Sequence, residues 1–350
     1  MANILNYLAW RGDVPLSVAP FNEVDNLILS ELAYTPLIDL VPPDGREVPL
    51  PEVRDQFFRT HTREELAAAK SFTAKAPLVM DGMVEGARFR DLRMCCHVAE
   101  SDRALDLQLS ATTFRLADGT SYVSFRGTDG TIVGWKEDFN FSFQPETEGQ
   151  KRAVGYLNWV ASLAPGPLRV GGHSKGGNLA IYASSFCDPA VQNRIWSVWS
   201  NDGPGFRPEI TQREGFQRIL PKVVQLIPDT SIIGQLLCSC CAQRVVKSDA
   251  SGLIQHDAFT WQTRRDGFEP AQLSVAGEAI RKLEDQLLDR VDDHAREEAI
   301  EAVFTLLNAT GMESFAEINE QKRKSAEGVL SSVLNVSKES IAGLVNRLRN

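Results

Sequence analysis

The chain has 350 residues, of which 43% are hydrophobic, and a formal net charge of −9. This length allows one large domain or two ordinary ones, and the composition is that of a globular protein. The acidic balance, with no long basic run, argues against a nucleic acid as partner.

The sequence carries no obvious targeting signal. Residues 1–16 lack a basic stretch followed by a sustained apolar one, so we do not expect a secretion signal. No run approaches the roughly 20 apolar residues that span a bilayer. The six cysteines include adjacent pairs, which are poor disulfide partners for each other. We therefore expect a cytoplasmic protein with reduced cysteines.

Residues 1–70 are predicted to form a helical and proline-rich segment that packs on the core. Helical patterns cover residues 22–34 and 62–70, and the second opens with acidic residues near the positive end of its dipole. Between them, the stretch 36–51 contains prolines that exclude regular helix, namely Pro42, Pro43, Pro49 and Pro51.

Residues 71–268 are predicted to form an α/β core. Strand patterns come first, and the turn 117–120 joins two of them as a hairpin. Strands then alternate with helices, which predicts a mostly parallel sheet. The predicted strands are 91–100, 105–116, 120–129, 167–172, 194–200, 221–227 and 242–248, and the predicted helices are 146–163, 176–186 and 208–219.

Residues 269–350 are predicted to form a C-terminal helical extension. Apolar residues at helical spacing share one face there, for example Ile280, Leu283, Leu287 and Val291. This extension is a candidate contact for a protein partner or a second copy of the chain.

The stretch GGHSKGG places Ser174 between Gly172 and Gly176, after a short apolar run and before an apolar helical one. This spacing is typical of a sharp strand-to-helix turn that lifts the serine oxygen clear of the sheet. The N-terminus of the following helix then stabilises a developing oxyanion. The alternative is a serine that only caps a helix in a glycine-rich turn. We interpret Ser174 as a nucleophile.

A serine nucleophile needs a base. Where the serine stands in such a strand-to-helix turn, the acid and then the histidine follow it in the chain. His256 lies in the loop after the last predicted strand and is the expected base. Asp202 follows the strand 194–200 in the tight turn DGPG, and Asp229 follows the next strand in the same way. We prefer Asp202 as the acid because its backbone is more restricted, and Asp229 is the alternative acid.

The oxyanion donors are expected at two places. The turn after the strand 120–129 reads FRGTD, where Thr128 offers its backbone N–H, and Lys175 offers its own directly after the serine. The apolar residues 232–237 and the aromatic residues Trp135, Phe139 and Phe141 either line an apolar pocket or belong to the core.

No cofactor and no metal are expected. The cysteines of CSCC (238–241) lack the second pair that zinc sites usually have. They follow an apolar run, and we interpret them as part of a lid-like helix.

Together, SFRGTD, GGHSKGGNLA, SNDGPGF and IQHDAFTW resemble the Mbeg1-like family, formerly a domain of unknown function in bacterial proteins related to the class 3 lipases. The similarity covers roughly residues 20–265. It implies an α/β-hydrolase fold with Ser174 as nucleophile, His256 as base and FRGTD as oxyanion loop. The class 3 lipases place their acid one strand later, which favours Asp229 and leaves the acid open.

The sequence therefore predicts a serine hydrolase that cleaves a carboxylic ester, such as a lipid or another small acyl ester, through an acyl-enzyme on Ser174. The alternative is a non-catalytic α/β-hydrolase-like module that binds a protein partner.

Overall fold

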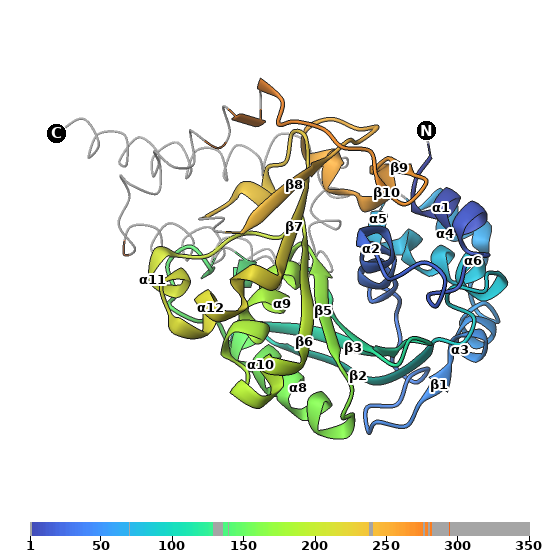
Figure 1. Ribbon diagram of the computed structural model, residues 1–350, viewed down its shortest axis with the longest axis horizontal. Helices are drawn as coiled ribbons and strands as arrows, with labels where there is room; N and C mark the ends of the chain where they lie inside the picture. The colour runs from blue at the N-terminus through green and yellow to red at the C-terminus, as the bar shows by residue number, and fades with distance from the viewer. Residues whose placement is uncertain are drawn as a thin grey trace, which may run out of the picture.

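A computed structural model describes residues 2–69, 71–128, 136–138, 140–237, 241–275, 277, 278, 281 and 294. An eight-stranded sheet runs through the described part, and its strand order follows the sequence from β1 to β8 (Figure 1). The predicted residues Ile280, Leu283, Leu287 and Val291 of the C-terminal extension lie outside the described residues.

The sheet has an antiparallel half and a parallel half. The strands β1 (Val48–Pro49), β2 (Arg93–Asp102), β3 (Leu107–Arg115) and β4 (Ser121–Phe125) pair in antiparallel fashion. The strands β5 (Leu168–His173), β6 (Ile195–Asn201), β7 (Val223–Pro228) and β8 (Ala242–Val246) continue from β4 as parallel neighbours. A separate hairpin pairs β9 (Thr263–Arg264) with β10 (Gly267–Phe268).

One face of the sheet is covered by the helices that connect the parallel strands. Parallel crossovers are right-handed as a rule, so connections that step through a sheet in one direction place their helices on one face. These helices are α8 (Glu148–Leu163), α9 (Lys175–Phe186), α10 (Pro189–Arg194), α11 (Pro208–Thr211) and α12 (Glu214–Ile219). Their apolar sides form one half of the core with β2 to β7, including Leu157, Leu179 and Val198.

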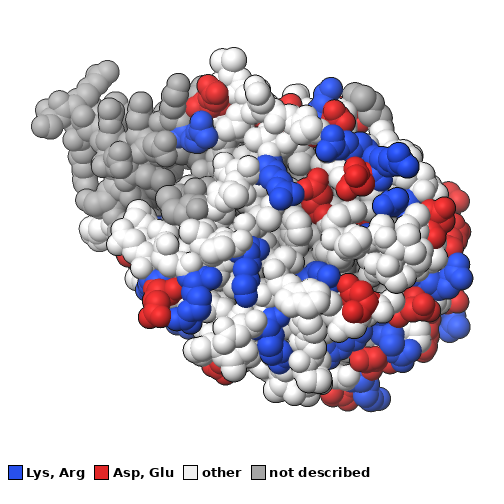
Figure 2. All heavy atoms as spheres, viewed as in Figure 1, with Lys and Arg blue, Asp and Glu red and all other residues white. Residues whose placement is uncertain are grey.

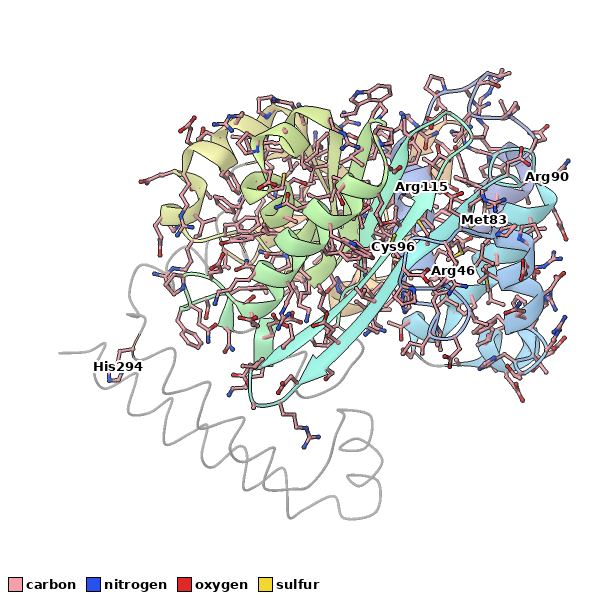
Figure 3. All side chains as sticks on the ribbon, turned by 90° about the horizontal axis from the view of Figure 1, so that it is seen from below. Arg46, Met83, Arg90, Cys96, Arg115 and His294 are labelled. Carbon is pink, nitrogen blue, oxygen red and sulfur yellow. The ribbon has the colours of Figure 1, made fainter. Side chains whose placement is uncertain are left out.

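The opposite face would stay exposed without the N-terminal helices, which pack against it (Figure 1). These are α1 (Ile4–Arg11), α2 (Glu23–Leu32), α3 (Leu50–Phe57), α4 (Arg63–Ala68), α5 (Phe72–Lys75) and α6 (Val79–Glu85). They bury the second half of the core, which includes Leu27, Met83 and Tyr122. Figure 3 shows Met83 among these helices and Cys96 in the sheet.

Short 3₁₀ turns complete the described elements: Ala76–Leu78, Leu220–Lys222, Ile233–Gln235, Gly252–His256 and Ala258–Thr260. Two of them, Ile233–Gln235 and Gly252–His256, lie in the loops that follow β7 and β8. Over the face drawn in Figure 2, acidic and basic side chains are interspersed.

Each predicted strand of the sheet is present, with ends that differ by a few residues. The predicted helix 208–219 is wrong as a single element, because Arg213 has extended backbone angles and separates α11 from α12. The proline-rich stretch contains no helix until Leu50, where Pro51 occupies the first turn of α3, a position that needs no amide hydrogen. The helices α1, α3, α5, α6 and α10 were not predicted.

Candidate active site

Ser174 occupies a strained turn between β5 and α9. Its φ of 58° and ψ of −134° form a combination that residues with a side chain rarely adopt. Ser174 is the residue before the first turn of α9, yet its side chain makes no capping hydrogen bond. The helix-capping interpretation of this serine is therefore wrong, and its hydroxyl is not used by the helix.

The glycines around Ser174 are required by close backbone contacts. A Cβ atom added to Gly172 would lie 2.4 Å from the carbonyl oxygen of Phe125, and one added to Gly176 would lie 2.0 Å from the same oxygen. Both distances are far below van der Waals contact. The spacing of the motif thus reflects how closely the turn approaches the end of β4.

The turn after β4 lies directly against the serine. A Cβ atom added to Gly127 would lie 2.9 Å from Cβ of Ser174 and 2.7 Å from the carbonyl oxygen of His173. Thr128 follows this glycine, and on the other side Lys175 begins α9, where the first amides have no acceptor within the helix. Both predicted oxyanion donors therefore come from segments that contact Ser174.

The hydroxyl of Thr128 donates a hydrogen bond to Oδ2 of Asp138 at 2.5 Å. The other oxygen of Asp138 is buried and has no hydrogen-bond partner among the described residues. Burial raises the pKa of the Asp138 carboxyl to about 6, against the opposing effects of Lys175 and of the Thr128 hydrogen bond. No buried acid was expected from the sequence beside this turn, which is the predicted oxyanion loop.

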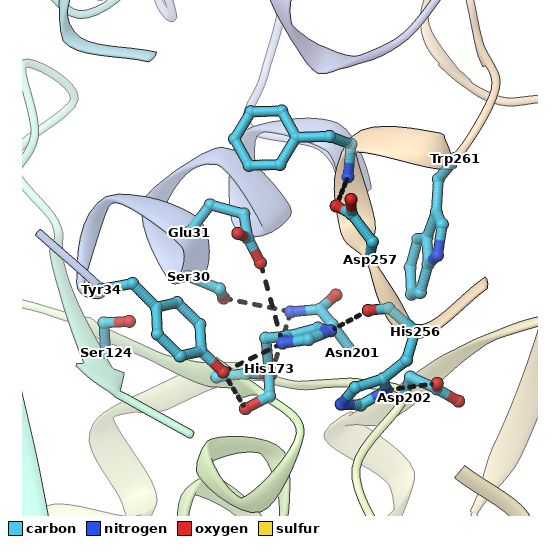
Figure 4. A network of polar contacts seen from close by, with 12 residues as sticks. Ser30, Glu31, Tyr34, Ser124, His173, Asn201, Asp202, His256, Asp257 and Trp261 are labelled. Carbon is cyan, nitrogen blue, oxygen red and sulfur yellow. Dashed lines mark hydrogen bonds and ion pairs between the residues drawn. The ribbon is translucent and has the colours of Figure 1, made fainter. Parts of the chain in front are cut away.

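His256 and Asp202 form a close pair (Figure 4). Nδ1 of His256 lies 2.7 Å from Oδ2 of Asp202, whose side chain is 1% exposed. The other oxygen, Oδ1, accepts hydrogen bonds from the hydroxyl of Ser231 at 2.5 Å and from the amide of Gly234 at 3.1 Å. A carboxylate only accepts, so Nδ1 carries the hydrogen and Nε2 of the neutral ring keeps its lone pair.

Strand register brings the acid and the serine to one edge of the sheet. His173 of β5 pairs with Asn201 of β6, so Ser174 and Asp202 are the next residues of two neighbouring parallel strands. The amide of Ser174 also donates to the carbonyl oxygen of Asn201 at 2.9 Å. Asp202 has a φ of 49°, in the left-handed region of backbone angles.

Asp229, the alternative acid, is bonded elsewhere. Its Oδ1 accepts a hydrogen bond from the side-chain amide of Gln255 at 2.6 Å. The side-chain oxygen of Gln255 in turn accepts from the amide of Thr230 at 2.8 Å. Asp229 thus anchors the loop that carries His256, and the acid in contact with Nδ1 is Asp202.

A second layer of polar residues packs against His256. The ring of His173 packs on the ring of His256, with centroids 4.5 Å apart, and its Nε2 lies 2.9 Å from the backbone carbonyl of His256 (Figure 4). The hydroxyl of Tyr34 in the segment after α2 lies 3.0 Å from Nδ1 of His173. No pattern in the sequence links His173 to Tyr34, which lie 139 positions apart.

His173 and Glu31 form a buried pair of neutral groups. Burial lowers the pKa of His173 well below its ordinary value, and burial together with Asp257 raises the pKa of the Glu31 carboxyl well above its own. Oε1 of Glu31 lies 3.7 Å from Nδ1 of His173, and neither oxygen of Glu31 has a hydrogen-bond partner among the described residues. Both shifts favour the neutral forms, so the pair is not an ion pair.

Hydrogen bonds fix α2 to the sheet beside this layer. The side-chain nitrogen of Asn201 donates to the hydroxyl of Ser30 and to the carbonyl oxygen of Gly172, both at 3.0 Å. Asn26 donates to the side-chain oxygen of Asn201 at 2.7 Å. The N-terminal helix α2 is thereby joined to the strands that carry Ser174 and Asp202.

The predicted pocket and lid are described only in part. Phe141 is buried in the core and borders a small recess together with Asn178 and Phe206. Trp135, Phe139 and the cysteines at 238 and 240 lie outside the described residues. Within the described part of the chain, no group of three or more potential ligands could hold a metal ion, and no helix is long and apolar enough to cross a membrane.

A sheet of eight strands with helices on both faces, and a strained serine turn after a central strand, defines an α/β-hydrolase fold. A sequence model of the Mbeg1-like family matches residues 83–305. The chain belongs to the Mbeg1-like family.

Other comparisons are more distant. The chain is similar in structure to a deletion mutant of the Rhizomucor miehei lipase–propeptide complex, with 13% identity, a TM-score of 0.42, and coverage of 79% of this chain and 75% of that one. For lipase II from Rhizopus niveus the identity is 14%, the TM-score is 0.40, and the coverage is 77% of this chain and 91% of that one. No curated protein sequence matches the chain.

Proposed function

We propose that this protein is a serine hydrolase that cleaves a carboxylic ester through an acyl-enzyme on Ser174. The observation that carries the proposal is the bond between His256 and Asp202 at the edge of the sheet where Ser174 turns into α9. In the neutral imidazole, this bond places the ring hydrogen on Nδ1, so that the lone pair of Nε2 can accept a proton as a general base requires.

In the proposed acylation step, Oγ of Ser174 attacks the ester carbonyl carbon while Nε2 of His256 accepts the hydroxyl proton. The carbonyl oxygen becomes an oxyanion and accepts hydrogen bonds from the backbone amides of Thr128 and Lys175. The intermediate then collapses as His256 gives the proton to the leaving alkoxide oxygen, which releases an alcohol.

Deacylation repeats these steps with water as the nucleophile. His256 accepts a proton from the water, hydroxide adds to the acyl carbon, and the proton passes to Oγ of Ser174 as the acid product leaves. Throughout, Asp202 holds the imidazole in the required tautomer and stabilises its protonated form. As the substrate class we propose a lipid or other acyl ester, in keeping with the motifs shared with the class 3 lipases.

A fluorophosphonate probe followed by mass spectrometry tests the nucleophile. We expect the adduct on Ser174, and we expect Ser174→Ala to lose about 10⁴-fold or more of the hydrolysis of p-nitrophenyl esters while remaining folded. Ser162→Ala, at an exposed helix end, is the matched control, because among the described residues its hydroxyl bonds only the carbonyl oxygen of Trp159.

Near-normal turnover by Ser174→Ala, or an adduct on another serine, would contradict the mechanism. A folded wild-type protein that neither reacts with the probe nor hydrolyses an ester of any chain length would favour the non-catalytic module.

A further inference from the structure

The residue after the nucleophile sends its side chain into the core. Lys175 is 1% exposed, and its Nζ donates to the backbone oxygen of Gln108 at 2.7 Å, to Oε1 of Gln108 at 3.0 Å and to Oε2 of Glu137 at 3.0 Å. An ammonium group has three hydrogens, so all its donors are used. A charge buried so fully is costly and needs a partner of opposite sign.

Glu137 is that partner, and it joins three elements. It is fully buried, and its Oε2 also accepts from the amide of Gln108 in β3 at 3.0 Å. Its Oε1 accepts from the amide of Gly149 in the first turn of α8 at 2.8 Å. The same carboxylate also accepts a hydrogen bond from Lys175, which is the first residue of α9.

Glu137 also lies next to the residue that holds the oxyanion turn. Asp138 accepts the hydrogen bond from the hydroxyl of Thr128, and Glu137 precedes it in the chain. Lys175 therefore contributes to the proposed oxyanion site in two ways. Its amide is one proposed donor, and its side chain fixes the segment that is bonded to the other donor, Thr128.

We propose that Lys175 and Glu137 form a positioning pair that sets the relative placement of the two oxyanion donors, the amides of Thr128 and Lys175. The inference rests on the proposed hydrolase function. Within the described part of the chain, the hydrogen bonds of the two side chains go to Gln108, to Gly149 and to each other. The pair acts by joining the start of α9 to the segment that follows the oxyanion turn.

Stability alone is a poor explanation for the pair. Replacing a buried ion pair by uncharged residues of similar volume is often neutral or stabilising, whereas removing one partner leaves a buried charge and is strongly destabilising. The double variant Lys175→Met with Glu137→Gln is therefore the informative one, since it removes both charges and largely keeps volume.

A second buried ion pair provides the matched control. Arg88 and Asp25 both have fully buried side chains, and Nε of Arg88 lies 2.6 Å from Oδ1 of Asp25. This pair lies within the N-terminal layer on the opposite face of the sheet. The double variant Arg88→Met with Asp25→Asn tests the general effect of removing a buried ion pair.

The experiment measures kcat and KM for a p-nitrophenyl ester, and the inhibition constant of an alkylboronic acid, at a temperature at which circular dichroism shows every variant folded. A boronic acid forms a tetrahedral adduct with a serine, so its affinity reports on the oxyanion donors. For Lys175→Met with Glu137→Gln we expect kcat to fall about 100-fold, boronate affinity to fall in parallel and KM to change little.

In the control double variant we expect kcat and boronate affinity to stay within about threefold of wild type. The inference is overturned if the Lys175–Glu137 double variant keeps wild-type kcat and boronate affinity, or if the control loses as much. Fluorophosphonate labelling of the wild type separates the two proposals. If Ser174 is not labelled and no ester is hydrolysed, the hydrolase function fails and the positioning role fails with it. If Ser174 is labelled, an unaffected double variant refutes the positioning role alone.

Discussion

The stability of Asp138→Asn relative to wild type should be higher near neutral pH than in acid. The pKa of the Asp138 carboxyl is raised by burial from 3.8 to about 6, so the folded state disfavours the charged form that prevails at neutral pH. Asparagine has nearly the same shape and no charge, and its side-chain oxygen can still accept the hydrogen bond from Thr128. Its amide then occupies the buried position where Oδ1 has no partner.

The magnitude follows from the difference between the folded and unfolded pKa. A raised folded pKa lowers the stability of the wild type as the pH rises from 3.8 to about 6, and the loss is constant above that. The full loss is up to about 3 kcal/mol, of which about 1 kcal/mol is already present at pH 4.5. The unpaired amide of the variant costs about 1–3 kcal/mol at every pH. Relative to wild type, the variant should therefore gain about 2 kcal/mol between pH 4.5 and pH 7.5.

Urea denaturation of both proteins at the two pH values, followed by tryptophan fluorescence, measures this difference. Titrating groups that do not interact with Asp138 are common to both proteins and cancel in the comparison. A stability difference that is the same at pH 4.5 and pH 7.5, or that shifts in favour of the wild type at pH 7.5, would refute the argument that Asp138 is held in an unfavourable charged state.

The other predictions concern the acid, the turn and the second layer. Asp202→Asn should lower kcat for a p-nitrophenyl ester by about 10⁴-fold, whereas Asp229→Asn should keep most of it; the reverse order would exclude Asp202 as the acid. Gly176→Ala should cost about 3 kcal/mol or prevent folding, because its Cβ would lie 2.0 Å from the oxygen of Phe125, and an unchanged thermal midpoint would contradict that clash. Glu31→Gln should stabilise the protein more at pH 7.5 than at pH 4.5, because burial raises the pKa of this carboxyl, and urea titrations that show no such dependence would argue against a neutral Glu31.

Features that depend on residues close together in the sequence could be predicted from the sequence alone. The turn at Ser174 follows from an apolar strand, small residues two positions before and after the serine, and an apolar helix. Backbone crowding excludes larger residues there, and it acts over a few residues, so it leaves a clear local pattern. Strands and helices also leave local patterns of apolar residues, and their alternation predicted the parallel half of the sheet.

The pairing of side chains was decided only by the tertiary structure. Asp202 and Asp229 follow neighbouring strands in similar turns, and the choice between them depends on which carboxylate meets His256, 54 positions from Asp202. The contact between Tyr34 and His173 spans 139 positions, and that between Lys175 and Glu137 spans 38. Such contacts depend on how the layers pack and where each side chain points. A single sequence gives the residue types but not these directions, so the contacts of His173 and Lys175 could be identified only in the folded chain.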